Sequence, residues 1–112
     1  MAVTSNYRVV NLGSSNTVAW TQSDVFIKNI SANTTLTLTD TYQTIVRLIV
    51  HNTSGSDRTL TFLTPGRTIR NASDMMLRVR ANTTLVYEFT ADATSSFLYC
   101  LAPLRLEAIF SP

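Results

Sequence analysis

The chain has 112 residues, of which 45% are hydrophobic and only 14% charged, and its formal net charge is +2. This length corresponds to one domain, and the composition excludes an intrinsically disordered chain. The single cysteine excludes an internal disulfide. So small a positive charge also argues against a nucleic-acid-binding protein, which would carry a denser basic stripe.

The first twenty residues differ in character from the rest. They lack the basic start and apolar core of a signal peptide, and no later apolar run is long enough to cross a bilayer. We therefore expect synthesis in the cytoplasm and no membrane partner. The segment Asn11–Asn16 is polar, whereas Val18–Trp20 is apolar. Residues 1–20 are predicted to form an N-terminal arm with a first strand, and residues 21–112 a β-sandwich, in a single domain overall.

Three side chains of the arm are candidates for contact with a partner: Tyr7, Arg8 and Trp20. Aromatic residues near a chain terminus often anchor in a pocket of a neighbouring protein. The alternative is that Trp20 closes one end of the chain's own barrel.

After the arm, short apolar or alternating runs recur about every ten residues, and turn-forming residues end each of them, which is typical of a β-sandwich or barrel. The predicted strands lie near Tyr7–Leu12, Asp24–Ile30, Thr34–Thr39, Gln43–His51, Arg58–Leu63, Met75–Arg80, Thr84–Thr90, Ser96–Leu101 and Arg105–Phe110. The predicted fold class is all-β: a single antiparallel β-sandwich, jelly-roll-like, with an N-terminal arm.

The phrase Ala-Asn-Thr-Thr-Leu occurs twice, at Ala32–Leu36 and Ala81–Leu85. Asn is tolerated in turns and Thr suits a pleated surface, so each copy predicts a turn that leads into a strand. The repetition favours a fold of two comparable halves.

Alternation within the strands predicts which side chains are buried. Leu36 and Leu38 point inward against Thr35, Thr37 and Thr39; the same pattern holds for Leu60 and Phe62, and for Leu77 and Val79. The run Ile45–Val50 is apolar on both faces except at Arg47. It therefore predicts a central strand or one covered by a partner chain, and a homodimer or trimer follows as an expectation.

Four arginines form the main candidate site: Arg67, Arg70, Arg78 and Arg80. The alternatives are a solvated strand edge, whose charge discourages further pairing, and an interface for an acidic protein surface. Direct contact with nucleic acid ranks below both.

Catalysis is not expected. One histidine and one cysteine cannot build a zinc site within the chain, and we expect no metal and no cofactor. His51 is predicted to face solvent at a loop, Glu88 to lie on the outer face of its strand, and Cys100 to be a small core residue. A hydrolase that uses His51 remains the enzymatic alternative.

The run Asn29–Leu101 resembles small structural proteins of tailed bacteriophages. The resemblance rests on the Asn-Thr-Thr-Leu-Thr-Leu strand at Asn33–Leu38, the apolar strand Ile45–His51, the Thr-Leu-Thr-Phe strand with its Pro-Gly turn, and the closing strand Leu85–Phe89. Within that group the chain is most similar to capsid decoration (cement) proteins. This resemblance implies a sandwich on the capsid exterior that binds the major capsid protein and bridges neighbouring subunits. The alternative is a receptor- or carbohydrate-binding module of a tail or head fibre.

Overall fold

The computed structural model describes residues 9–70, 77–92 and 97–105, the last five of these by their backbone alone. They form ten β-strands: β1 (Val9–Asn11), β2 (Thr17–Ala19), β3 (Val25–Ile30), β4 (Thr34–Thr39), β5 (Ile45–Asn52), β6 (Arg58–Leu63), β7 (Thr68–Arg70), β8 (Arg78–Val79), β9 (Thr84–Ala91) and β10 (Phe97–Arg105).

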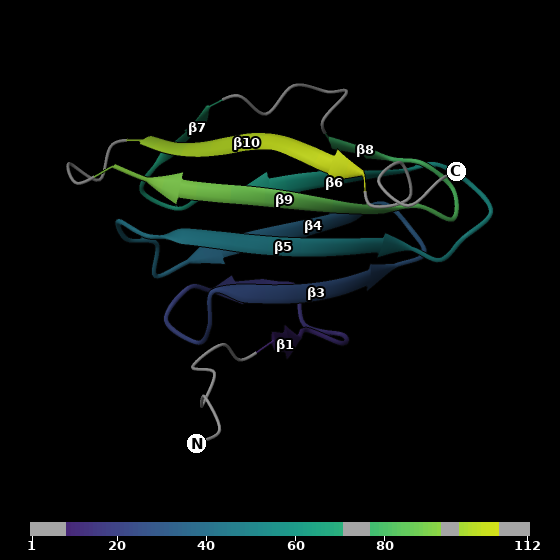
Figure 1. Ribbon diagram of the computed structural model, residues 1–112, viewed down its shortest axis with the longest axis horizontal. Coiled ribbons are helices and arrows are strands. Elements are labelled where there is room, and N and C mark those ends of the chain that lie inside the picture. Colours follow the sequence, from purple (N-terminus) through teal and green to yellow (C-terminus); the bar gives the residue numbers. More distant parts are fainter. Residues whose placement is uncertain (1–8, 71–76, 93–96, 106–112) are drawn as a thin grey trace, which may run out of the picture.

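The strands build two packed sheets, which confirms the predicted all-β sandwich. The six-stranded sheet has the order β1-β3-β5-β9-β10-β7, and the four-stranded sheet has the order β2-β4-β6-β8. Figure 1 looks onto the six-stranded sheet, with β4 and β6 of the other sheet behind β5 and β9. The two-faced run Ile45–Val50 lies in β5, between β3 and β9, so it is a central strand as predicted.

The predicted antiparallel, jelly-roll-like pairing is wrong. Five of the eight pairings are parallel: β1 with β3, β3 with β5, β2 with β4, β4 with β6, and β7 with β10. The physical reason is that successive strands from β1 to β8 alternate between the sheets. From β1 to β6, a chain that crosses to the other sheet and back re-enters the first sheet in its original direction, so the neighbours there become parallel. The exception is β8, which runs antiparallel to β6.

Most predicted strands are found, with small differences in their bounds. β4 and β6 have the predicted limits, whereas the short strands β2 and β7 were not predicted. The predicted break before Arg105 is also wrong, because β10 continues from Phe97 to Arg105. Its register against β9 shifts between Leu101 and Leu104, so one extra residue near Pro103 is accommodated as a bulge. The predicted segments 7–8, 75–76 and 106–110, and residue 96, lie outside the described residues.

The residues of the predicted arm that are described belong to the sandwich itself. β1 pairs with β3 at the edge of the six-stranded sheet, and β2 pairs with β4 at the edge of the four-stranded sheet. Trp20 follows β2 directly and donates its backbone N–H to Thr39 O at 3.1 Å. Its side chain is only 1% exposed, so it closes the chain's own core, as the alternative interpretation proposed.

The core lies between the sheets and follows the predicted alternation. Leu36, Leu38, Leu60 and Val79 from the four-stranded sheet are buried. They face buried residues of the six-stranded sheet: Phe26, Val46, Leu48, Val50, Tyr87, Phe89 and Leu98. Phe62 packs edge-on against both Tyr87 and Phe89, with ring centroids 5.5 and 5.1 Å apart. Edge-to-face aromatic pairs of this kind add stability beyond their burial, so this cluster joins the two sheets.

The two copies of the Ala-Asn-Thr-Thr-Leu phrase each lead into a strand, as predicted, but they do not mark equivalent halves. The first enters β4, which is parallel to its neighbours, and the second enters β9, which is antiparallel to its neighbours. Asn33 accepts a hydrogen bond from Thr59 N through its side chain. Asn82 instead takes a left-handed backbone, with φ of 56°.

Candidate protein-binding surfaces

The outer face of the four-stranded sheet is a regular array of threonines. Because side chains alternate along a strand, burying Leu36, Leu38 and Leu60 turns their neighbours outward. We call this array the threonine face: Thr17, Thr35, Thr37, Thr39, Thr59 and Thr61. Thr17 pairs with Thr37, and Thr35 pairs with Thr61, so hydroxyl groups lie side by side on adjacent strands. None of the described strand residues in this sheet is acidic.

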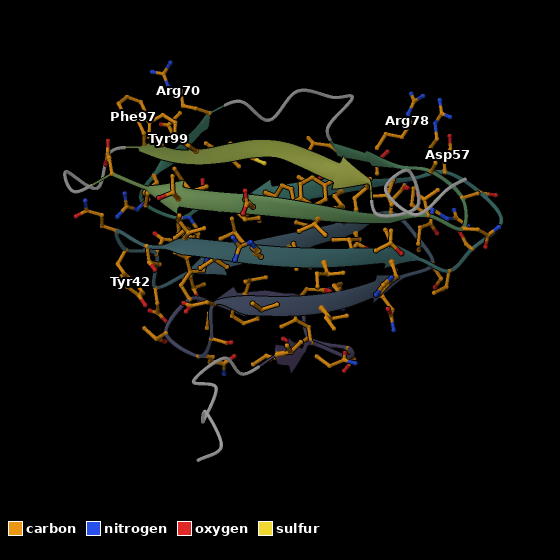
Figure 2. All side chains as sticks on the ribbon, in the orientation of Figure 1. Tyr42, Asp57, Arg70, Arg78, Phe97 and Tyr99 are labelled. Atoms are coloured by element: carbon orange, nitrogen blue, oxygen red, sulfur yellow. The ribbon has the colours of Figure 1, made fainter. Side chains whose placement is uncertain are left out.

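Arg78 and Arg80 lie at the β8 edge of the threonine face. Arg78 pairs with Thr59 of β6, and both arginines are exposed. The nearby Asp57 is engaged with the backbone, since its Oδ1 accepts a hydrogen bond from Ala81 N at 3.0 Å. Figure 2 shows Arg78 and Asp57 at the same end of the sandwich. This edge therefore presents two cations beside an uncharged face.

A buried amide holds the backbone under this basic edge. Asn52 ends β5 and is 2% exposed. Its Nδ2 donates to the carbonyl oxygens of Ser56, Val79 and Arg80 at 2.8–3.1 Å, and its Oδ1 accepts from Ser54. These bonds join the β5–β6 connection to the β8–β9 connection, so the arginines stand on a fixed backbone.

The structure separates the four arginines that the sequence grouped. Arg67 lies at the opposite end of the sandwich from Arg78, and its side chain is only 7% exposed. Its guanidinium donates to Thr41 Oγ1 at 2.8 Å and to the carbonyl oxygens of Asp92 and Phe97 at 3.2 Å. The Asp92 carboxylate lies 3.5 Å away. Arg67 therefore ties loops of both sheets together and is not an exposed contact residue.

Arg70 is exposed, but it is part of a different cluster. It lies on β7, with its guanidinium carbon 4.3 Å from the centroid of the Phe97 ring. Phe97 and Tyr99 of β10 are half-buried, and their ring centroids are 6.5 Å apart. Figure 2 shows these three side chains together, far from Arg78. Of the remaining predicted contact residues, Trp20 is buried in the core, and Tyr7 and Arg8 lie outside the described residues.

The outer face of the six-stranded sheet is a second surface, which the sequence interpretation only touched on. Its side chains come from the outward positions of β1, β3, β5 and β9, and many are apolar. We call it the apolar face: Val9, Val25, Ile27, Ile45, Ile49 and Val86. Val9 is 54% exposed and Ile45 is 53% exposed. In the sequence, this face was indicated only by the run in β5 that is apolar on both sides. The apolar residues beside it on β3 and β9 could be identified only from the register of the paired strands.

A single ion pair lies in the middle of the apolar face. Arg47 of β5 and Glu88 of β9 are directly opposite each other, and Arg47 Nε donates to Glu88 Oε2 at 2.8 Å. Glu88 thus lies on the outer face, as predicted. His51 lies on this face near the end of β5; it is half-buried in a strand, not in a solvent-facing loop, and its Nδ1 is 2.7 Å from Thr84 Oγ1.

Three ionisable side chains whose pKa burial shifts lie inside the sandwich: Lys28, Tyr87 and Cys100. Burial raises the pKa of the Cys100 thiol to about 12, and the side chain is fully covered, which confirms the prediction of a small core residue. Burial also lowers the pKa of Lys28. Its Nζ donates to the carbonyl oxygens of Gly13 and Ser15 at 2.7 and 2.8 Å, which fixes the β1–β2 connection.

Among the described residues, no three His, Cys, Asp or Glu side chains are grouped in a way that could hold a metal ion. Nor does that part of the chain include a helix with the length and hydrophobicity needed to cross a membrane. Comparison of the chain with protein-family models, with curated proteins and with solved structures gives no match. The surfaces themselves are therefore the basis for any functional proposal.

Proposed function

We propose that the chain is a non-enzymatic structural protein of a bacteriophage particle. In this proposal it decorates the outside of the capsid and stabilises it by bridging neighbouring capsid subunits. The resemblance of Asn29–Leu101 to phage decoration proteins suggests the class. The observation that carries the proposal is the threonine face with Arg78 and Arg80 at its edge.

The threonine face has properties that suit late docking onto a preformed shell. Threonine is β-branched and stiff, so little side-chain entropy is lost when the face is covered. Its hydroxyl groups keep the free protein soluble yet can form hydrogen bonds with a partner. Leu63, which is 51% exposed, adds an apolar contact on the same face. Arg78 and Arg80 favour a capsid surface that is acidic, since complementary charge speeds association and fixes register.

Stabilisation of the capsid would follow from mass action. A ligand that binds the assembled shell but not its separated subunits stabilises the shell by RT ln(1 + [L]/Kd) at each site. A closed shell repeats the same site many times, so weak binding at each site adds up to a large effect. No bond is made or broken in this mechanism, and no catalytic residue is needed.

The test is co-sedimentation of the purified chain with undecorated, expanded phage heads. We expect saturable binding at a fixed ratio to the major capsid protein. The double variant Arg78→Glu/Arg80→Glu should bind at least about tenfold more weakly because two attractive contacts become repulsive. The matched control is Arg70→Glu, an exposed arginine at the opposite end of the sandwich, which should bind like the unmodified chain. A folded chain that does not bind heads would contradict the proposal.

The alternative function, a receptor- or carbohydrate-binding module of a tail or head fibre, has one observation in its favour. Phe97, Tyr99 and Arg70 form a half-exposed aromatic and cationic cluster at one end of the six-stranded sheet. Trp20 cannot serve as the sugar platform, because it is buried. Glycan-array binding that Tyr99→Ala removes, together with no binding to heads, would favour this alternative.

A further inference from the structure

The apolar face contains a continuous row of branched aliphatic side chains. Ile27 of β3 pairs with Ile49 of β5, and Ile49 pairs with Val86 of β9. All three are half-exposed. Figure 1 shows β3, β5 and β9, the three strands that carry this row, side by side in the sheet nearest the viewer. Val25 lies next to Ile27 on β3 and pairs with Val9 of β1, so the apolar area extends from the row toward the β1 edge. Ile45 lies on the far side of the Arg47–Glu88 pair from the row.

The charge on this face is balanced in a way that suits a second copy of the same chain. On the central strands β3, β5 and β9, the charged outward residues are Arg47 and Glu88, one of each sign, side by side. In a two-fold arrangement, the same patch meets itself. Arg47 of one copy can then lie beside Glu88 of the other, so that the charges alternate. A face with an excess of one sign would repel its own copy.

The size of the face also fits a pair of chains. The sheet has six strands, and β5 and β9 have eight residues each. With strands about 4.8 Å apart and a rise of about 3.3 Å per residue, the strand residues of the whole sheet, β7 and β10 included, cover roughly 500–600 Å² of plane. The strands of the apolar face, β1, β3, β5 and β9, supply about two-thirds of this area. Two copies that pair over the whole sheet would bury about 1,000–1,200 Å² in total, which is at the lower end for a specific protein interface.

The apolar face is better suited to self-association than the threonine face because it is the more hydrophobic of the two. Homodimer interfaces are more apolar than interfaces between proteins that meet only transiently. A large apolar area left open on a free chain is an aggregation hazard. A second copy is the partner that is always present when the chain is made, whereas a capsid is encountered later.

We propose that two copies of the chain pair through their apolar faces about a two-fold axis, with Ile49 near the centre of the contact. The threonine faces then point outward on opposite sides of the dimer. This inference does not depend on the binding of heads, and it can be tested on the purified chain alone.

The experiment is sedimentation equilibrium of the full chain over a wide range of concentration. We expect a reversible dimer. Glu88→Arg should weaken dimerisation at least about tenfold, because it places like charges across the axis. The double variant Arg47→Glu/Glu88→Arg should restore dimerisation to within about threefold, because it exchanges the signs and keeps the alternation. Circular dichroism confirms that each variant is folded.

The matched controls separate the two faces. Ile49→Arg should give a folded monomer, whereas Thr37→Arg, on the opposite sheet, should leave the dimer intact. Three results would overturn the proposal: an unmodified chain that stays monomeric at high concentration, a mass above that of a dimer, or a dimer that Thr37→Arg disrupts and Ile49→Arg does not.

Discussion

The two outer faces of the sandwich follow the same rule and differ in chemistry. On both sheets every second side chain is buried, and the remaining ones point outward. On the four-stranded sheet the outward positions are mostly threonine. On the six-stranded sheet they include a group of valines and isoleucines beside the Arg47–Glu88 pair, with polar residues such as Asn29 and Thr84 near one end. The alternation that builds the core fixes only the inward residues. The outward residues can differ between the two sheets, and they determine which partner each face can bind.

Both faces are held in place by the core between the two sheets and by the contacts at the ends of the sandwich. Arg67 holds one end of the sandwich, where loops from both sheets meet. Trp20 and the aromatic cluster fill the space between the sheets. A substitution that unfolds this scaffold should therefore abolish binding through both faces. A substitution confined to one face should weaken only the binding of the partner of that face.

The largest expected effect is at Arg67. Arg67→Met should lower the free energy of unfolding by about 3–5 kcal/mol, because it removes a buried guanidinium and leaves the half-buried Asp92 carboxylate and the carbonyl groups of Asp92 and Phe97 without their cation. Urea denaturation measures this loss. The control Arg78→Met removes an exposed arginine and should change stability by less than about 0.5 kcal/mol. Equal losses in the two variants would contradict the structural role of Arg67.

The core beneath the threonine face comes next. Leu38 is 1% exposed, and Leu38→Ala should cost about 3 kcal/mol through lost burial and the cavity left behind. The neighbouring Thr37 points outward, so Thr37→Ala should cost less than about 1 kcal/mol. Together, the two variants compare the loss of unfolding free energy at an inward-facing residue with the loss at its outward-facing neighbour. If Thr37→Ala were the more damaging, the assignment of the faces would be reversed.

A smaller effect concerns alkaline pH. Burial raises the pKa of the Cys100 thiol to about 12 in the folded chain, whereas the thiol has its ordinary pKa of 9.0 in the unfolded chain. Its contribution to stability is therefore complete below pH 9 and is lost as the pH rises toward 12. The expected slope is at most about 1.4 kcal/mol per pH unit. Tyr87, whose pKa burial also raises, acts in the same direction above pH 10.0.

Lys28 acts in the opposite direction, because burial lowers its pKa and the folded chain binds its proton less tightly than the unfolded chain. Thermal melts of the unmodified chain and of Cys100→Ala across this pH range therefore isolate the thiol by difference. The variant should lose less stability than the unmodified chain between pH 9 and 11. Parallel pH profiles would show that Cys100 does not titrate as its burial requires.

Much of the core could be predicted from the sequence because it depends on local alternation. Leu36, Leu38, Leu60 and Phe62 were assigned inward from a period of two, and all four are buried. Strand direction could not be predicted in this way, since alternation is the same in parallel and antiparallel pairs. It is decided by which sheet each connection crosses to, and short connections such as that between β3 and β4 cross to the other sheet.

The candidate surfaces were predicted only in part. Arg78 and Arg80 were correctly placed together on one exposed strand face, because alternation determines it. Their grouping with Arg67 was wrong, since residues close in sequence can lie at opposite ends of a sandwich. Arg67 binds the carbonyl oxygen of Phe97, a residue that Figure 2 shows far from Arg78. The apolar face required register: Ile27, Ile49 and Val86 are far apart in the sequence and meet only when β3, β5 and β9 are aligned.

The central claim is that the two faces have different partners, and cysteine labelling tests it most directly. Cys100 is buried with a raised pKa, so the unmodified chain should resist alkylation at neutral pH. Thr61→Cys and Ile49→Cys then each report on one face. We predict that Thr61→Cys labels rapidly in the free dimer. On phage heads, the copy whose threonine face is docked should label at least about tenfold more slowly, while the outward-facing copy of the same dimer still labels rapidly. Ile49→Cys should label slowly in both states. Rapid labelling of Ile49→Cys in the free chain, with protection only on heads, would contradict the account.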